Sequence, residues 1–121
     1  NVEEILKKYQ FLVGTQPIPP RWVFGNLMSR FGYRSQKQLF DIIQKMKTNT
    51  IPFDAAIIDL FWFGDGIKGT LGNLAWNKKS WPEPEKMIKN LSKAGIHTIL
   101  ITEPYVLNTT PNYEPSKNFK R

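Results

Sequence analysis

Two acidic residues stand where a ligand-binding side chain of an α/β protein is expected. Asp59 interrupts an apolar run, and Glu103 follows another. In parallel α/β sheets and barrels, ligands bind beyond the carboxyl ends of the strands, where such acids can accept hydrogen bonds. A carboxylate in an apolar run is costly unless it is paired or hydrogen-bonded. A structural explanation is also open, because Asp59 could bond backbone groups or pair with Arg30, and Glu103 could simply end a strand.

Arg30 and a group of aromatic residues accompany these acids. Arg30 could bridge to an acid, either as a positioning cation or as a structural ion pair. Aromatic rings stack on the CH faces of sugars and carboxylates accept from hydroxyls, so the combination favours a carbohydrate site. The aromatic candidates are Phe31, Tyr33, Phe61, Trp62, Phe63, Trp76 and Trp81. About half of them are expected only to pack in the core.

Other chemistries find little support. The chain has no Cys and one His, His97, which excludes a disulfide framework, a thiolate nucleophile and a Cys-ligated metal. We therefore expect neither a metal nor a cofactor, and we interpret His97 at a strand start as structural. The glycines between Gly64 and Gly72 lack the strand-to-helix pattern of a nucleotide-binding loop.

The charge says little about function. The sequence has 17 Lys and Arg against 10 Asp and Glu, a formal net charge of +7. The lysines between residues 78 and 93 alternate with glutamates as on a solvated helix face, so we expect no nucleic-acid partner. No apolar run approaches the roughly 18 residues of a membrane span, so we expect no membrane partner.

Hydrophobic spacing predicts alternating strands and helices. Residues 2–12 have a helical period, and the proline-rich segment 14–21 reads as a linker. Strands are predicted to begin near Trp22, Ala55 and His97, the second reaching Phe63 and the third Thr102. Ser35 with Gln38 forms a capping box that starts one helix, and Pro84 starts another that ends before Gly95. The tail after residue 104 has no clear period.

This order predicts an α/β fold with a parallel sheet. A complete (β/α)₈ barrel needs about 200 residues or more, so 121 residues cannot form one. We divide the chain into a lead-in helix and linker, 1–21, and the first three strands with their helices, 22–121. The sequence starts at Asn1 without a Met, which makes a processed or truncated chain plausible.

Several ordered motifs resemble the start of the catalytic barrel of glycoside hydrolase family 31. They cover most of the chain and occur in the family's order and spacing. They are Pro19-Pro20-Arg21-Trp22-Val23-Phe24-Gly25, Met28-Ser29-Arg30-Phe31-Gly32-Tyr33, Ile58-Asp59-Leu60 with the aromatics after it, Trp81-Pro82-Glu83-Pro84, and Ile99-Leu100-Ile101-Thr102-Glu103-Pro104. The family contains α-glucosidases, α-xylosidases and α-glucosyltransferases.

The resemblance implies a partial (β/α)₈ TIM barrel, with the first three parallel strands and the intervening helices. Family members are retaining enzymes whose nucleophile and acid/base are aspartates on the fourth and sixth strands. We therefore expect no catalytic residue here and an inactive fragment. What carries over is substrate binding: Asp59 matches an aspartate that holds glucose hydroxyls, Phe31 matches a subsite tyrosine, and Leu60 matches an apolar wall residue. The predicted substrate-binding set is Asp59, Phe31, Leu60, Trp62, Glu103 and Arg30.

Some positions depart from the family pattern. Phe61 stands where many members have a second acid, and Glu103 stands where they have an aspartate before the proline. These variants resemble the bacterial branch that includes oligosaccharide 4-α-glucosyltransferases. Hydrolysis or transfer, glucose or xylose specificity, and cytoplasmic or periplasmic location stay open.

The expected partners are an α-linked oligosaccharide and either the remainder of the barrel or a second copy, because strand edges are left unpaired. The alternative function is a stand-alone carbohydrate-binding or interaction module without catalysis.

Overall fold

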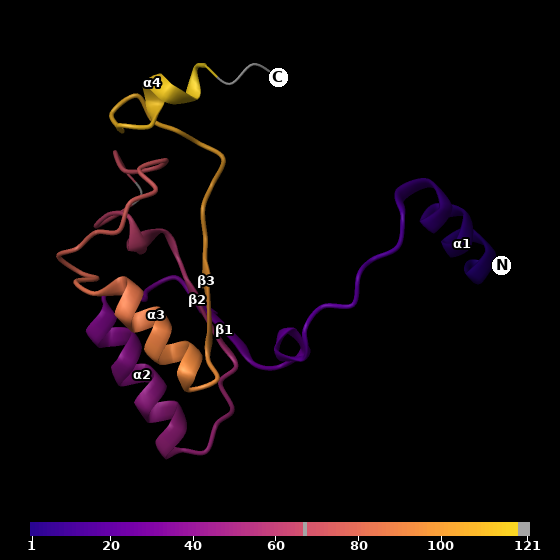
Figure 1. Cartoon of the computed structure of the whole chain (residues 1–121), viewed down its shortest axis with the longest axis horizontal. Helices are drawn as coiled ribbons and strands as arrows, with labels where there is room; N and C mark the ends of the chain where they lie inside the picture. The colour runs from indigo at the N-terminus through magenta and orange to yellow at the C-terminus, as the bar shows by residue number, and fades with distance from the viewer. Residues whose placement is uncertain (67, 119–121) are drawn as a thin grey trace.

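The structure is a computed structural model that describes residues 1–66 and 68–118. Its centre is a sheet of three parallel strands, β1 (Leu27–Arg30), β2 (Ala55–Ile58) and β3 (His97–Leu100), in the order β1-β2-β3. Leu27 lies opposite Ala55, and Ala55 opposite His97. Helices α2 (Gln36–Thr48) and α3 (Pro84–Lys93) alternate with the strands (Figure 1). The α/β fold with a parallel sheet is therefore confirmed.

Both crossover helices begin where the sequence predicts. The Ser35 hydroxyl accepts from the backbone N–H of Gln38 at 3.2 Å and caps α2. The second half of the capping box differs, because the Gln38 amide oxygen accepts from the N–H of Arg34 at 2.8 Å rather than from that of Ser35. Pro84 is the first residue of α3, where its missing N–H is not needed. Gly95 follows this helix with a φ of 76°.

The two helices cover the same face of the sheet (Figure 1). Their buried apolar residues pack with the strand residues that point to this side. The cluster includes Leu39, Ile43, Ala56, Ile58, Met87 and Leu91. The half-buried Ile57 and Ile99 alternate with these strand residues, so they point to the face without helices. A sheet covered on one face by its crossover helices has the layering of a barrel wall.

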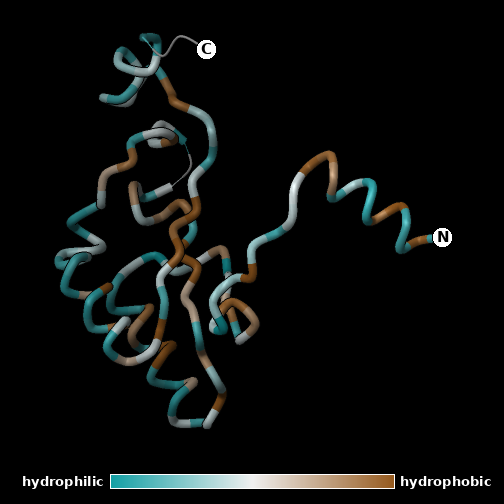
Figure 2. Tube along the Cα trace, turned by 45° about the vertical axis from the view of Figure 1, so that its right-hand side comes forward, coloured by the Kyte–Doolittle hydropathy of each residue, from teal (hydrophilic) through white to brown (hydrophobic). Residues whose placement is uncertain are grey.

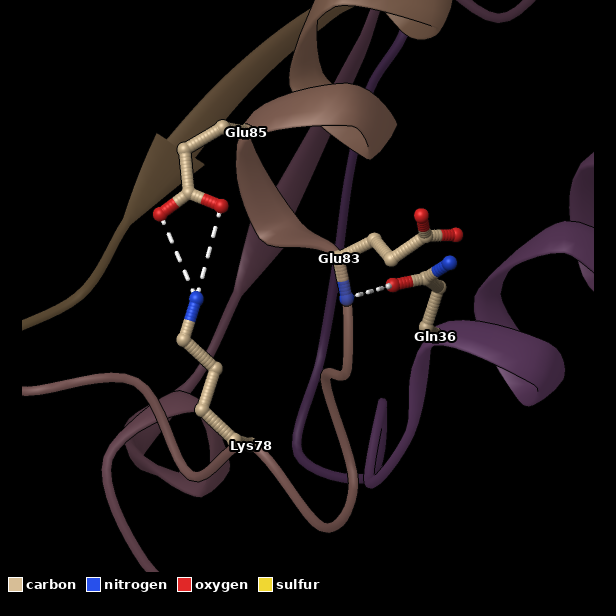
Figure 3. Close-up of polar contacts among 4 residues, drawn as sticks. All are labelled: Gln36, Lys78, Glu83 and Glu85. Carbon is tan, nitrogen blue, oxygen red and sulfur yellow. Dashed lines mark hydrogen bonds and ion pairs between the residues drawn. The ribbon is translucent and has the colours of Figure 1, made fainter.

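Polar contacts tie the start of α3 to its surroundings (Figure 3). The N–H of Glu83 donates to the Gln36 side chain of α2 at 3.3 Å, and Lys78 forms an ion pair with Glu85 at 3.3 Å. The pKa of Glu85 is lowered, first by a hydrogen bond from its own backbone and then by Lys78. The pair is exposed, so we expect it to orient the loop more than to stabilise the fold.

The predicted start of the first strand near Trp22 is wrong. Residues Arg21–Phe24 form a 3₁₀ helix, η1, and β1 begins only at Leu27. Pro20 enters this turn in an extended conformation, and the Trp22 ring stacks on His97 with centroids 4.2 Å apart. Trp22 therefore packs against the start of β3 instead of extending β1, while Phe24 of the same run is largely exposed. His97 has a packing contact, in line with a structural role.

The second and third strands end earlier than predicted. After Ile58 the chain turns into a 3₁₀ helix, η2 (Leu60–Trp62), although its residues are apolar and buried. The reason is local, because Asp59 caps this turn with its side chain. The third strand ends at Leu100, although the N–H of Ile101 still donates to the Ile58 carbonyl at 2.9 Å.

The first helix stands apart from the sheet. Helix α1 (Val2–Val13) ends at Gly14, and residues 15–20 lead from it to η1 as an extended segment (Figure 1). None of its residues is buried, and its apolar residues appear as separate hydrophobic bands in Figure 2. At the other end, a short helix, α4 (Tyr113–Ser116), occupies part of the tail for which no period was evident. Among the described helices, none has the length and hydrophobicity of a transmembrane span.

The sheet edges lead to a first prediction, that the 121-residue chain self-associates. Strands β1 and β3 each pair on one side only within the described sheet, which leaves rows of N–H and C=O groups for another strand. We expect a mass above that of the monomer in light scattering at micromolar concentration, falling on dilution. A monodisperse monomer throughout the dilution series would show that these edges are protected.

Candidate functional site

Asp59 occupies the carboxyl end of β2 with its carboxylate half-buried. Its backbone is extended, and Oδ1 accepts from the N–H of Leu60 at 2.7 Å. This hydrogen bond agrees in part with the structural explanation, in which Asp59 bonds backbone groups. Within the described residues, Oδ2 accepts no hydrogen bond, which leaves an acceptor at the rim of the sheet. The local turn therefore fixes Asp59 by one oxygen and leaves the other free for a ligand.

Arg30 ends β1 at the same edge, but it does not pair with an acid. Arg30 lies opposite Ile58 in the register, so Asp59 follows on the neighbouring strand. Among the described ion pairs there is none between Arg30 and Asp59 or Glu103. The Arg30 guanidinium instead lies 5.9 Å from the centre of the Tyr33 ring. The structural alternative of an Arg30–Asp59 pair is therefore wrong, and a role of Arg30 toward a ligand stays a prediction.

Leu60 and Trp62 are packed inside the protein. Their side chains are 3% and 6% exposed. The indole N–H of Trp62 donates to the Ile101 carbonyl at 2.8 Å, which ties the loop after β2 to the end of β3. In contrast, Glu103 is exposed beyond the end of β3. Contact of these three residues with a ligand stays a prediction.

Most of the seven aromatic candidates serve the core. Trp76 lies between Trp62 and Trp81, with ring centroids 5.3 and 5.8 Å away. The exception is Phe31, which is 60% exposed in the loop after β1. The fully or nearly buried members are Tyr33, Phe61, Trp62, Phe63 and Trp81. We expected about half of these residues to pack in the core, and the structure shows that more of them do. Phe31 is the one whose ring is largely exposed.

Tyr33 is buried without a partner for its hydroxyl group. The side chain is 0% exposed, and its oxygen makes no hydrogen bond with the described residues. Burial raises the pKa of the phenol above its ordinary value, and the Arg30 cation opposes this only in part. The neutral phenol is the form that suits this position.

Replacing Tyr33 by phenylalanine is expected to raise the free energy of unfolding at neutral pH by about 1 kcal/mol, because a buried polar group without a partner is lost. The raised pKa adds a pH dependence. Above the ordinary tyrosine value of 10.0, the phenol ionises in the unfolded chain before it does in the folded one, so stability falls as the pH rises. In Tyr33→Phe, the stability should fall less as the pH rises, because this phenol is absent.

Denaturant titrations at neutral and alkaline pH measure both effects of Tyr33→Phe. Tyr105→Phe is the matched control, because Tyr105 is 60% exposed. A clear loss of stability in Tyr33→Phe at neutral pH would mean that the hydroxyl has a partner.

One residue at this rim was not singled out from the sequence. The Arg34 guanidinium carbon lies 4.2 Å from the centre of the Phe61 ring. The two residues belong to loops after different strands, so only the closeness of Arg34 to the Phe31-Gly32-Tyr33 motif pointed to it. Within the described residues there is no group of three or more His, Asp or Glu residues suited to hold a metal ion.

The structure thus brings Asp59, Phe31 and Arg30 to one edge of the sheet. This edge offers a carboxylate oxygen, an exposed aromatic ring and a guanidinium group. It could bind a polyhydroxylated ligand by hydrogen bonds and ring stacking. Among residues 1–66 and 68–118, this edge has no pair of facing carboxyl groups of the kind that glycosidic bond cleavage uses.

Comparison with known proteins gives this edge a context. An alpha-glucosidase of Saccharolobus solfataricus is 28% identical over 115 residues, which are 95% of this chain and 16% of that protein. Alpha-xylosidase XylQ of Lactiplantibacillus pentosus is 30% identical over 118 residues, 96% of this chain and 15% of that protein. The chain therefore spans about one sixth of the length of these relatives.

A solved structure shows the same fold. A GH31 dextranase of Flavobacterium johnsoniae, complexed with glucose, superposes with a TM-score of 0.73 and 29% identity. The match covers 84% of this chain and 12% of that one. Residues 16–121 also match the profile of the glycosyl hydrolases family 31 TIM-barrel domain. The family resemblance is thus confirmed, and the chain belongs to glycoside hydrolase family 31, of whose TIM barrel it forms a part.

Proposed function

We propose that this chain supplies part of the sugar-binding subsite of a retaining α-glycosidase that acts on α-linked glucosides, by hydrolysis or by 4-α-glucosyl transfer. The observation that carries the proposal is the half-buried Asp59 directly after β2, at the same edge of the sheet as the exposed residue Phe31 directly after β1, in a family 31 barrel segment. The named activities of the relatives, alpha-glucosidase and alpha-xylosidase, support it.

The binding chemistry follows from the two side chains. The free oxygen of Asp59 accepts hydrogen bonds from sugar hydroxyls, and a bond to a charged acceptor is stronger than one between neutral groups. The Phe31 ring offers its face to the CH groups of a pyranose. Leu60, Trp62, Glu103 and Arg30 complete the proposed set, in which the family resemblance gives Leu60 the role of an apolar wall residue.

Catalysis itself is proposed to lie outside these strands. Retaining cleavage needs a nucleophile and an acid/base on opposite sides of the scissile bond, about 5 Å apart. The Asp59 carboxylate accepts from the N–H of Leu60 at the rim of β2, and Glu103 is exposed in the loop after β3. The family resemblance puts the two catalytic aspartates on the fourth and sixth strands, so the 121-residue chain alone should not turn over substrate.

The test is Asp59→Ala in the complete enzyme that carries this barrel segment. Loss of a hydrogen bond to a charged acceptor costs about 1.5 to 3 kcal/mol, so kcat/KM for an α-glucoside should fall about 10- to 100-fold. Asp41→Ala is the matched control, because Asp41 is an exposed acid of α2 paired with Lys37 on the outer surface. An unchanged kcat/KM in Asp59→Ala would overturn the proposal.

The alternative, a stand-alone carbohydrate-binding module, is separated by experiments on the 121-residue chain. The exposed Phe31 ring is the feature that favours it. Saturable binding of maltose in calorimetry at millimolar or tighter affinity would favour the module, and no binding would favour a barrel segment. Turnover of a chromogenic α-glucoside by the pure chain would overturn the view that the catalytic acids lie elsewhere.

A further inference from the structure

The exposed ring of Phe31 needs support from other residues. Phe31 follows β1 directly and precedes Gly32, whose φ is 153°. A loop with glycine at this point does not by itself fix the direction of an exposed side chain. The Phe31 ring contacts the Phe61 ring, with centroids 4.9 Å apart and planes tilted by 52°. The orientation of Phe31 therefore depends on Phe61.

Phe61 is a rigid base for this contact. Its side chain is 3% exposed, and its backbone belongs to η2. The Phe61 carbonyl accepts from the indole N–H of Trp81 at 2.9 Å, and Trp81 is fully buried. Packing holds the Phe61 ring, and the hydrogen bond from Trp81 holds its backbone, so the ring has a fixed place at the rim.

Arg34 adds a second contact on the same ring. Its guanidinium carbon lies 4.2 Å from the centre of the Phe61 ring, a cation–π distance. Its backbone N–H is held by the Gln38 side chain at the start of α2. Arg34 forms no ion pair with the described residues, so the ring contact is the one that orients its guanidinium group. Arg34 is itself exposed, so we expect a variant that lacks its side chain to fold.

We propose that Phe61 and Arg34 are positioning residues that hold the ring of Phe31 at the edge of the sheet where Asp59 follows β2, as a platform for the apolar face of a sugar. This inference rests on the proposed function, since it takes Phe31 to contact the substrate. The family resemblance puts an acid at the position of Phe61 in many members, and an acid there could accept hydrogen bonds from hydroxyls directly. Here the residue two positions after Asp59 acts through an aromatic neighbour.

Steady-state kinetics of the complete enzyme test this arrangement with an α-glucoside substrate. Arg34→Ala should raise KM about 2- to 5-fold with kcat unchanged, because the loss affects binding through one cation–π contact. Arg34→Lys should recover most of the affinity, since an ammonium group can also lie over the ring. Phe61→Leu should raise KM about 2- to 10-fold. Lys37→Ala, an exposed cation of α2, is the control that should leave KM unchanged.

A double substitution separates positioning from general damage. If Arg34 acts through Phe31, Arg34→Ala should have no further effect on KM once Phe31→Ala has removed the platform. A full additional effect in the Phe31→Ala background, or an unchanged KM in Arg34→Ala and Phe61→Leu, would overturn the inference. Thermal unfolding of Phe61→Leu checks that the variant folds, and Arg34→Ala keeps the test valid if it does not.

The kinetics also distinguish this inference from the proposed function. If Asp59→Ala leaves kcat/KM unchanged, the proposed subsite is wrong. If Asp59→Ala lowers kcat/KM while the Arg34 and Phe61 variants leave KM unchanged, the subsite stands and the positioning role is wrong.

Discussion

Replacing Gly25 by alanine is expected to lower the free energy of unfolding by about 3 to 5 kcal/mol. An alanine Cβ at this position would overlap Cγ and Oδ2 of Asp54 and lie 2.9 Å from its Cβ. Asp54 must then move or the chain between η1 and β1 must shift. Either movement disturbs the hydrogen bonds that Asp54 makes at the starts of the strands.

Asp54 joins the starts of all three strands. Its Oδ2 accepts from the N–H of Asn26 at 2.7 Å, just before β1. Its own N–H donates to the Asn26 carbonyl at 3.0 Å, and its carbonyl accepts from the N–H of His97 at 2.8 Å. Displacing Asp54 therefore costs a charge-assisted hydrogen bond in addition to the overlap, and it loosens the register of β1 against β2.

Denaturant unfolding of the single and double variants measures this effect. Asp54→Ala removes the two overlapping atoms, so the added cost of Gly25→Ala should be clearly smaller in that background. Gly66→Ala is the matched control, because nothing lies within 4 Å of a Cβ there. Equal costs of Gly25→Ala in both backgrounds would show that the Asp54 contact does not explain the need for glycine.

The order of elements was predictable because its signals are local. Helical spacing and end signals such as Ser35 and Pro84 act over a few neighbouring residues, and both crossover helices begin at those signals. The apolar runs before Asp59 and Glu103 predicted strands without any knowledge of their partners. Most of β2 is buried as expected, but β3 is only half-buried along its length. Alternation of these elements then implied the parallel sheet.

The ends of the strands were not predictable from apolar composition alone. The residues from Trp22 and those after Asp59 are as apolar as the strands, yet they form 3₁₀ turns. Contact with a distant residue decides the first case, where Trp22 stacks on His97. In the second case, the N–H of Leu60 donates to the Asp59 side chain instead of to a neighbouring strand.

The candidate site also combines features that local sequence signals predict with features that depend on distant contacts. Asp59 could be predicted, because an acid in an apolar run at a strand end requires a reason in any fold. The burial of Leu60 and Trp62, the exposure of Phe31 and the contact of Arg34 with Phe61 depend on how separate loops meet. Contacts between loops that are distant in the sequence leave no periodic pattern, so the packing role of most aromatic residues is seen only in the structure.

Replacing Gly72 by alanine is expected to release the chain after β3 from the loop after β2. Gly72 has a φ of 86°, and an added Cβ would lie 2.6 Å from the Val106 Cα and 2.7 Å from the Tyr105 oxygen. These are backbone atoms, so a change of rotamer cannot relieve the overlap. We expect a loss of about 2 to 4 kcal/mol, combining the cost of a positive φ with that of overpacking.

The two segments are held together around this glycine by three hydrogen bonds. The N–H of Leu107 donates to the Leu71 carbonyl at 3.1 Å, and the Asn112 side chain donates to the carbonyls of Gly72 and Asn73 at 2.7 Å each. Hydrogen exchange at Leu107 should accelerate strongly in Gly72→Ala, together with the fall in the free energy of unfolding. Exchange in β2 should change less, because the sheet ladder is intact.

Gly69→Ala separates backbone strain from overlap in this experiment. Gly69 lies in the same loop with a φ of 79°, but nothing lies within 4 Å of its added Cβ. It should lose only about 1 kcal/mol, with Leu107 still protected. If both variants lose the same stability and protection, the close approach at Val106 contributes nothing. A larger loss in Gly72→Ala would mean that this approach fixes the chain after β3, and with it Glu103, relative to the loop that follows Asp59.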